Sequence, residues 1–249
     1  MKISIITVCF NSEQTIESSL RSVISQTGVE REHILVDGAS TDGTLDVIER
    51  HHDKLTKMIS EPDRGIYDAM NKGLRVATGD VIGFLNADDV YSHQNVLAMV
   101  VEIMKREHLD ALFGDVEFFS PENMDRTVRR YSSAHFCPER IAWGWMPAHP
   151  ALFLKRSVYE RFGLFRTDYR IAGDFELVAR IFKSGSLKYQ HMPEALVRMR
   201  TGGISTSGLF NTILLNREVL RACRENGIST NWLKILLKYP VKLLEFYRK

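Results

Sequence analysis

Cysteine is scarce in this sequence of 249 residues, which has three: Cys9, Cys137 and Cys223. They lie far apart and lack the close spacing of cysteine metal ligands. An odd number of isolated cysteines also does not suit the disulfide framework of a secreted domain. We therefore predict reduced thiols and a cytoplasmic protein.

Long apolar runs are missing as well. No stretch approaches the roughly 18 residues that a membrane-spanning helix requires, and Met1-Lys2 leads directly into a strand-like segment without the features of a signal peptide. Neither sign of charge is in excess, because 33 basic and 31 acidic residues leave a net charge of +2. This balance argues against a protein that binds nucleic acid by attracting its phosphates.

What the sequence does contain is a regular alternation of strand-like and helix-like segments over its first 115 residues. The predicted strands cover residues 3–10, 33–36, 57–60, 80–89 and 111–115, and the helices between them begin near residues 13, 44, 66 and 92. Such alternation predicts an α/β fold with a Rossmann-like, mostly parallel sheet flanked by helices.

The pattern changes after residue 115. The second half predicts an antiparallel pair at 116–119 and 127–131, strands at 151–154 and 187–190, and helices at 157–162 and from Gly173. Internal repeats and low-complexity linkers are absent, so we predict one domain over residues 1–205. Its first half (1–115) is expected to bind a nucleotide and its second half (116–205) another substrate. A helical C-terminal extension, residues 206–249, follows.

The end of this extension has a distinct pattern. On a helical wheel, one narrow arc is charged and the rest of the surface is apolar and aromatic. The charged arc consists of Lys234, Lys238, Lys242, Glu245 and Lys249. Pro240 is expected to kink or divide the helix. Two interpretations stay open: a helix that lies in a membrane interface, or one that docks on the body or on a second subunit.

Two adjacent carboxylates, Asp88 and Asp89, follow the apolar strand at residues 80–89, with Asn86 nearby. They could cap the next helix. They could equally hold a divalent cation, because Mg²⁺ is typically bound by one or two carboxylates plus substrate phosphates, and Mn²⁺ shares this preference for oxygen. Asp88, helped by Asp89, is therefore a candidate ligand for the metal of a nucleotide diphosphate.

Other polar residues are candidates for binding a nucleotide. Asp37 ends a strand and could accept hydrogen bonds from a base or ribose, or simply close its own turn. Asp63, next to Arg64, has a weaker case against a surface turn, and Asn71 is expected to face the cleft. Arg198, Arg200 and Gly202-Gly203 could cover phosphates or form a plain turn.

Candidates for the reaction itself lie in the second half. Asp174 could cap its helix, but it could also act as the general base that an acceptor hydroxyl needs. His149 lies in a loop rich in aromatic residues and proline. It is a candidate substrate contact, with a structural histidine as the alternative.

Five segments together resemble family 2 glycosyltransferases of the A-type fold. They are Ser4-Ile-Ile-Thr-Val-Cys-Phe-Asn11, Val36-Asp-Gly-Ala-Ser-Thr-Asp-Gly-Thr44, Glu61-Pro-Asp-Arg-Gly-Ile-Tyr-Asp-Ala-Met-Asn-Lys-Gly73, Phe84-Leu-Asn-Ala-Asp-Asp89 and Gly173-Asp-Phe-Glu176. The resemblance runs over residues 1–205 and is strongest to bacterial enzymes that build surface polysaccharides: O-antigen (lipopolysaccharide), capsule or exopolysaccharide.

The resemblance implies inverting transfer of a sugar from a nucleotide sugar, a UDP-hexose, with Mn²⁺ or Mg²⁺ as cofactor. It implies that Asp37, Asp63 and Asn71 contact the donor and that Asp88 is the principal metal ligand. It also places the catalytic base at Asp174, with His149 and Glu176 as acceptor contacts. Two residues depart from the family pattern: Asn86 and Gly173 each stand where many members have an acidic residue.

The implied acceptor is a polyprenyl-diphosphate-linked sugar at the inner face of the cell membrane, which the C-terminal helix would contact. Two alternative functions fit the sequence less well. A nucleotidyltransferase would need a glycine-rich, basic phosphate loop after the first strand, and residues 9–12 do not provide one. A catalytically silent scaffold subunit that binds nucleotide sugars could lose Asp88 or Asp174, yet both are present.

Overall fold

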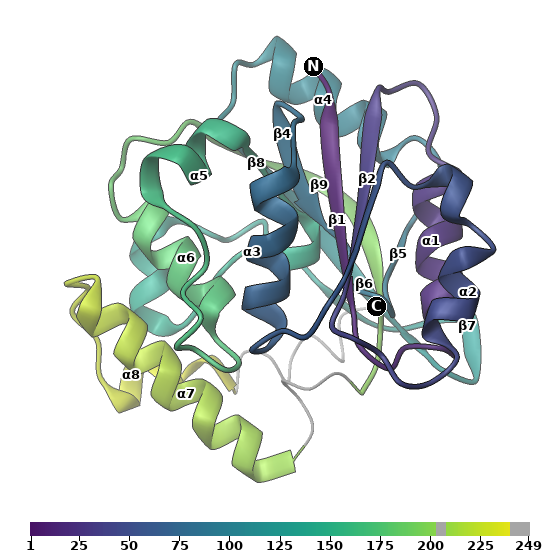
Figure 1. Cartoon of the computed structure of the whole chain (residues 1–249). Coiled ribbons are helices and arrows are strands. Elements are labelled where there is room, and N and C mark those ends of the chain that lie inside the picture. The colour runs from purple at the N-terminus through teal and green to yellow at the C-terminus, as the bar shows by residue number, and fades with distance from the viewer. Residues whose placement is uncertain (203–207, 240–249) are drawn as a thin grey trace.

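The fold is described from a computed structural model, in which residues 1–202 and 208–239 are described (Figure 1). The strands are β1 (Ile3–Cys9), β2 (Arg31–Asp37), β3 (Lys57–Ser60), β4 (Val81–Phe84), β5 (Val90–Tyr91), β6 (Ala111–Ser120), β7 (Asn123–Tyr131), β8 (Leu152–Lys155) and β9 (Tyr189–Arg200). The helices are α1 (Ile16–Ile24), α2 (Thr44–Glu49), α3 (Ile66–Val76), α4 (Val96–Arg106), α5 (Arg156–Phe162), α6 (Gly173–Phe182), α7 (Gly208–Glu225) and α8 (Trp232–Leu236).

The strands form a single sheet in the order β3-β2-β1-β4-β8-β6-β9-β5, and β7 pairs with β6 outside this path. Strands β3, β2, β1 and β4 are parallel to one another, and β6 is parallel to β9. The pairings of β8, β5 and β7 are antiparallel. The predicted α/β sheet flanked by helices is thus confirmed, with its antiparallel pairings gathered in the second half.

Both faces of this sheet are covered by helices, as Figure 1 shows. Every residue of β1 is buried, and successive side chains point to opposite faces. Ile3 and Ile5 pack in one apolar cluster with residues of α4, whereas Ile6 and Val8 pack in another with residues of α3 and α6. A sheet buried on both faces explains why the early strands are continuous apolar runs.

The parallel strands end at one edge of the sheet. Cys9 pairs with Asp37, and Asp37 pairs with Ser60, so the carboxyl ends of β1, β2 and β3 are level with one another. Strand β4 also ends there, because Phe84 pairs with Ile6. In open α/β sheets ligands bind at this edge.

Strand boundaries in the second half differ from the prediction. Residues 111–115 and 116–119 were expected as two strands but form one, β6, which runs along β9 as far as Phe119 and Arg200. Strand β9 was expected only at 187–190. Shifts in register on either side of Asp115, and the polar residues of β9, interrupt the apolar pattern that sequence reasoning relies on. Short strand β5 was not expected, and α4 begins at Val96 instead of near Ser92.

The C-terminal extension is helical, as predicted, and α7 and α8 lie against the same side of the molecule as α6 (Figure 1). The described lysines of the charged arc favour the second interpretation, a helix docked on the body. Lys238 is only 4% exposed and Lys234 lies over the ring of Trp143, so both pack onto the protein. The remaining members of the arc, and Pro240, lie outside the described residues.

Candidate active site

Asp37, at the carboxyl end of β2, is completely buried. It accepts hydrogen bonds from the backbone N–H of Ser40 at 3.1 Å, the Ser40 hydroxyl at 2.5 Å and the Ser60 hydroxyl at 2.7 Å. The structure therefore shows the second alternative: the Asp37 side chain closes its own turn. A contact with a nucleotide base stays a prediction.

Asp63 lies beside Asp37 because it packs on the intervening glycine. A Cβ atom at Gly38 would come within 2.5 Å of the Asp63 carboxylate and 3.4 Å of the Phe10 ring. A side chain at position 38 would therefore require the Asp63 carboxylate to move away. Phe10 itself is 60% exposed. Sequence reasoning missed Phe10, although an aromatic residue at the end of a buried strand was a usable signal.

The acidic pair after β4 lies in surroundings that favour neutral carboxyl groups. Asp89 is 1% exposed, and burial, together with the nearby charge of Asp88, holds the pKa of Asp89 well above its usual range. Burial also raises the pKa of Asp88. Asn86 donates to Asp89 at 3.1 Å, whereas the Oδ1 atom of Asn86 is buried without a hydrogen-bond partner.

These groups suit a hard divalent cation. Two adjacent carboxyl groups with raised pKa values and an unpaired amide oxygen are all oxygen donors, and a cation among them would offset the cost of ionising them. Over residues 1–202 and 208–239, no group of three or more His, Cys, Asp or Glu side chains could hold a metal by itself. Oxygen atoms of the substrate would have to complete the coordination, as is usual for Mg²⁺.

Arg200 joins this acidic pair from the end of β9. Its backbone N–H donates to Asp89, and its charge lowers the pKa of Asp88. Arg198, two residues earlier, turns elsewhere: its guanidinium donates to the Met124 carbonyl and lies over the Phe119 ring. Of the two predicted arginines, only Arg200 is at the site. Gly202 is at the end of the described segment, and Gly203 lies outside the described residues.

Asp174 is in the first turn of α6 and is partly exposed. Its Oδ1 atom accepts a hydrogen bond from the Phe175 backbone N–H at 2.7 Å and one from the Tyr67 hydroxyl at 3.3 Å. Burial raises the pKa of Asp174, and the neighbouring His149 and the two hydrogen bonds oppose the rise. Both of these hydrogen bonds are to Oδ1, so Oδ2 is the oxygen that could receive a proton from a substrate hydroxyl.

The residue before Asp174 must be glycine in this structure. A Cβ atom at Gly173 would come within 2.7 to 2.9 Å of three carbons of the Tyr67 ring. The Tyr67 ring is buried, so it cannot move aside easily. Close packing of this tyrosine thus accounts for the glycine at a position where the family often has an acidic residue.

His149 is near enough to Asp174 for each side chain to affect the pKa of the other, but its ring is buried in the protein, as in the alternative of a structural histidine. Its ring stacks on Phe84 with centroids 5.3 Å apart and meets Phe165 edge-on at 5.6 Å. Burial lowers the pKa of His149, so the imidazole is neutral at neutral pH, although the charge of Asp174 opposes the shift. Phe84 is the last residue of β4, which precedes the acidic pair. The stacked rings of Phe84 and His149 therefore lie between the acidic pair and the start of α6.

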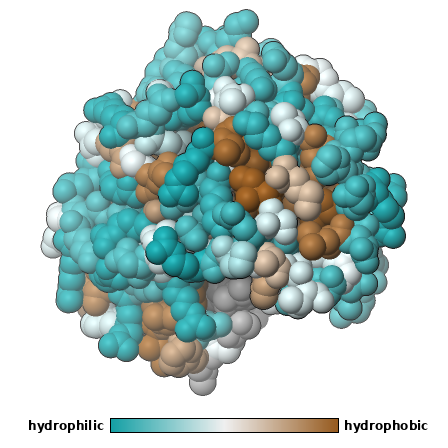
Figure 2. Space-filling view, in the orientation of Figure 1, coloured by the Kyte–Doolittle hydropathy of each residue, from teal (hydrophilic) through white to brown (hydrophobic). Residues whose placement is uncertain are grey.

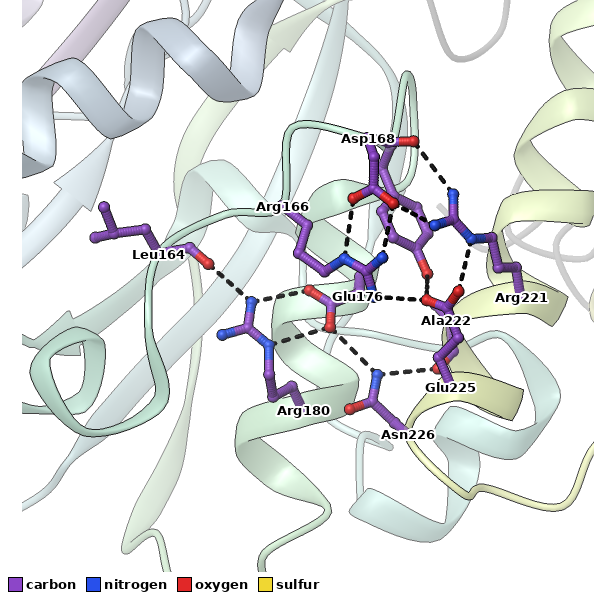
Figure 3. Close-up of polar contacts among 10 residues, drawn as sticks. Leu164, Arg166, Asp168, Glu176, Arg180, Arg221, Ala222, Glu225 and Asn226 are labelled. Carbon is purple, nitrogen blue, oxygen red and sulfur yellow. Dashed lines mark hydrogen bonds and ion pairs between the residues drawn. The ribbon is translucent and has the colours of Figure 1, made fainter.

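Two predicted site residues have structural contacts instead. Asn71 is 3% exposed and makes a pair of hydrogen bonds with the backbone of Phe165, at 2.8 and 2.9 Å. Glu176 was expected to contact the acceptor. It is 2% exposed, and its carboxylate accepts hydrogen bonds from Arg180 at 2.9 and 3.0 Å and from Asn226 at 3.3 Å (Figure 3). Because these polar groups are already paired in the protein interior, neither residue is available to a substrate.

A cavity of about 170 Å³ lies beside Tyr67, between the start of α3 and the loop that precedes α6. Two of its walls carry exposed arginines, Arg64 and Arg170. Asp168 also lines it, but its carboxylate is already paired with the side chain of Arg166. Arg64 is also paired, with Asp68 at 3.7 Å, and the lining includes Tyr67, the side chain that contacts Asp174.

Comparison with known proteins agrees with this arrangement. The model of the family described as Glycosyl transferase family 2 matches residues 4–170. A PGL/p-HBAD biosynthesis glycosyltransferase of Mycobacterium bovis is 32% identical over 222 residues, which cover 88% of this chain and 82% of that protein. An uncharacterized glycosyltransferase of Haemophilus influenzae is 27% identical over 98% of this chain and 80% of its own length.

Solved structures share the fold. TarS 1–349 from S. aureus, in complex with UDP-GlcNAc, matches with a TM-score of 0.68 and 19% identity, over 89% of this chain and 66% of its own. The mannosyltransferase PcManGT from Pyrobaculum calidifontis, in complex with GDP-Man and Mn²⁺, matches with a TM-score of 0.62 and 20% identity, over 99% and 81%. The predicted A-type fold is thereby confirmed.

Proposed function

The chain belongs to glycosyl transferase family 2, and we propose that it is an inverting hexosyltransferase that moves a sugar from a UDP-sugar to a hydroxyl group of a glycan acceptor. One observation carries this proposal. The partly exposed carboxylate of Asp174 has its Oδ1 atom held by Tyr67 and the Phe175 N–H, and the aromatic stack of His149 and Phe84 lies between it and a separate acidic pair.

The proposed reaction is a single displacement. Asp174 takes the proton from the acceptor hydroxyl while that oxygen attacks the anomeric carbon from the face opposite UDP. The new C–O bond forms as the bond to the UDP oxygen breaks, and UDP leaves with the bonding electrons. An α-linked donor therefore gives a β-linked product. The raised pKa of Asp174 matches this role, because a base with a pKa closer to neutrality draws a proton more strongly.

The donor would bind at the carboxyl ends of the parallel strands. Phe10 is exposed beside Gly38 and Asp63, so its ring is available to stack on the uracil base, with Asp37 and Asp63 near the base and ribose. Asp88 and Asp89 would hold Mn²⁺ or Mg²⁺, which supplies positive charge for the departing diphosphate. Arg200 lies next to Asp88 and would add a second positive charge. The choice of UDP follows the UDP-GlcNAc complex of TarS.

The acceptor would enter by the cavity beside Tyr67. Its two exposed arginines, Arg64 and Arg170, suit an acceptor with an anionic group, such as a sugar linked to a lipid diphosphate. An acceptor of this kind would place the enzyme in the synthesis of a surface glycan. The naming of the mycobacterial relative for PGL/p-HBAD biosynthesis is consistent with a role in glycan synthesis.

A lipid-linked acceptor requires contact with a membrane surface, and we assign that contact to α7 and α8. Large apolar side chains are exposed on both helices; they are Phe210, Ile213, Trp232, Leu233, Leu236 and Leu237. Figure 2 shows apolar surface at the lower edge of this face, over α7. Exposed aromatic and aliphatic side chains on surface helices suit peripheral attachment to a membrane. No described helix is long and apolar enough to cross a membrane.

A donor screen tests the proposed function. The purified chain is incubated with Mn²⁺ and a panel of UDP-, GDP- and dTDP-sugars, with and without a synthetic polyprenyl-diphosphate sugar, and released nucleotide is measured. We expect turnover with a UDP-hexose, enhanced by the lipid-linked acceptor, and a product with inverted anomeric configuration by NMR. Tight UDP-sugar binding without turnover over the whole panel would instead indicate a silent scaffold subunit.

A separate experiment tests membrane contact. We expect the chain to float with vesicles that contain anionic lipid and polyprenyl diphosphate. Replacement of Trp232, Leu233 and Leu237 by serine should abolish flotation. Equal flotation of the triple variant and the original chain would contradict the assignment.

A further inference from the structure

Glu218 on α7 binds the backbone of the loop that leads to Asp174. Its carboxylate accepts hydrogen bonds from three successive N–H groups, those of Arg170, Ile171 and Ala172, each at 2.8 Å. Gly173 then begins α6, and Asp174 is its second residue. The carboxylate is buried, at 8% exposure. Three converging N–H groups fix both the position and the direction of the chain where it enters the helix.

The same short segment is held from the other side by Tyr67. The Tyr67 hydroxyl donates to the Ile171 carbonyl at 2.5 Å and also contacts Asp174 at 3.3 Å. The N–H of Ile171 points to Glu218 while its C=O points to Tyr67. Glu218, Ile171, Tyr67 and Asp174 thus form one continuous chain of hydrogen bonds.

Helix α6 lacks a cap of its own, which makes this external carboxylate important. The residue at its N-cap is Ala172, whose side chain cannot accept a hydrogen bond. Capping side chains are worth about 1 kcal/mol, and a negative charge near a helix N-terminus is favourable. Glu218 supplies a negative charge to the uncapped start of α6 from a helix that is distant in sequence.

Other contacts between α7 and this loop involve side chains farther from Asp174. Figure 3 shows Arg166 and Asp168 paired with Arg221 and Glu225 of α7. These groups are partly exposed to solvent, and exposed ion pairs contribute little stability. Glu225 is therefore a matched control for Glu218: the same residue type, on the same helix, contacting the same loop but not the backbone next to Asp174.

We propose that Glu218 is a positioning residue for catalysis: through the backbone of residues 170–172 it sets the place of Asp174, and it makes α7 a part of the active site. This inference rests on the role proposed for Asp174. Both residues lie beyond the segment, residues 4–170, that the family model matches. The C-terminal extension thus adds a contact to the loop before Asp174 from outside the segment that the family model matches.

The test compares Glu218→Gln with Glu225→Gln in the full chain. Glutamine keeps the size of the side chain but replaces one acceptor oxygen with an N–H donor, so at least one loop N–H loses its partner. We expect kcat of Glu218→Gln to fall by about 10- to 100-fold, as small misplacements of a catalytic group do, with KM for the donor unchanged. Glu225→Gln should stay within about twofold of the original kcat.

A second readout separates positioning from general stability. The Ile171 carbonyl, at 2.5 Å, competes with Asp174 for the single hydrogen of the Tyr67 hydroxyl, so loosening residues 170–172 leaves that hydrogen to Asp174 and lowers the pKa of Asp174. The acid limb of the pH–rate profile should therefore move to lower pH. Hydrogen exchange of the three loop amides should also quicken. If Glu218→Gln does not fold, Glu218→Asp replaces it, because aspartate keeps the charge on a shorter side chain. We expect kcat and the acid limb of Glu218→Asp to change in the same direction but by a smaller amount.

Failure of this inference can be told from failure of the proposed function. If Asp174→Asn is inactive while the folded Glu218 variant keeps the original kcat and acid limb, the positioning role is overturned and the function stands. If Asp174→Asn keeps full turnover, the proposed base is wrong, and the positioning role is overturned with it.

Discussion

Two acidic sites in this protein are held in different ways. Asp88 and Asp89 lie in a turn directly after β4, and the side chain that donates to Asp89 belongs to Asn86, three residues earlier. Asp174 is contacted by Tyr67, which is 107 residues away in sequence, and its loop is held by Glu218, 46 to 48 residues away.

The difference shows that the two halves of the proposed reaction have different structural requirements. The acidic pair is held by its own turn and by one backbone N–H from the end of β9, and a metal ion organises its own ligands once oxygen atoms are nearby. A single base must already be in place to within a fraction of an ångström, so it is supported by contacts from several elements. The following predictions test this contrast.

The largest effect is expected at the base. Asp174→Asn should lower kcat by about 100- to 10,000-fold, since a positioned general base contributes that much. Binding of the UDP-sugar, measured by calorimetry, should be unchanged because the donor residues lie at the other acidic site. A variant with near-original turnover would remove Asp174 from its role.

Asp88→Ala should abolish the effect of cation on donor binding. In the original protein we expect UDP to bind about tenfold or more tightly with Mn²⁺ than with a chelator, because the cation joins the carboxylates to the diphosphate. Calorimetric titration of UDP into both proteins measures the difference. Equal affinities with and without Mn²⁺ in the original protein would contradict the metal site.

Gly173→Ala probes the support of the base. The added Cβ atom would lie 2.7 Å from the buried Tyr67 ring. Overpacking of this kind destabilises a protein by about 1–3 kcal/mol. We expect a lower free energy of unfolding in urea and a lower kcat. In a Tyr67→Leu background, where the ring is absent, the same substitution should cost less. Equal costs in both backgrounds would show that the ring contact is not the cause.

The smallest effect concerns the buried charge of Asp89. Because the pKa of Asp89 is raised on folding, the neutral form is favoured, and stability is lost as pH rises through that raised pKa. Asp89→Asn should therefore be more stable than the original chain at about pH 7.5, by about 1 kcal/mol, and not at about pH 3, where the original carboxyl is mostly protonated in both states. Mn²⁺ together with UDP should stabilise the original chain more than the variant.

Part of this site was predictable from the sequence. Asp88, Asp174 and His149 were identified as candidates, and the structure places His149 beside Asp174. Phe10 was missed, and Asn71 and Glu176 were assigned to substrates although they pair with Phe165, Arg180 and Asn226. A polar residue in a motif shows that a polar partner exists. Whether that partner is a ligand or another part of the protein depends on packing.

The early strands and helices and the position of the acidic pair could be predicted from the sequence alone, because apolar periodicity and the end of a strand are local properties of the chain. The pairing of β6 with β9, the reason for glycine at residue 173 and the side chains that hold Asp174 became clear from the tertiary structure. Those contacts join residues that are tens to more than a hundred positions apart. Such contacts depend on how whole helices pack against the sheet, and this packing cannot be predicted from any short segment of the sequence.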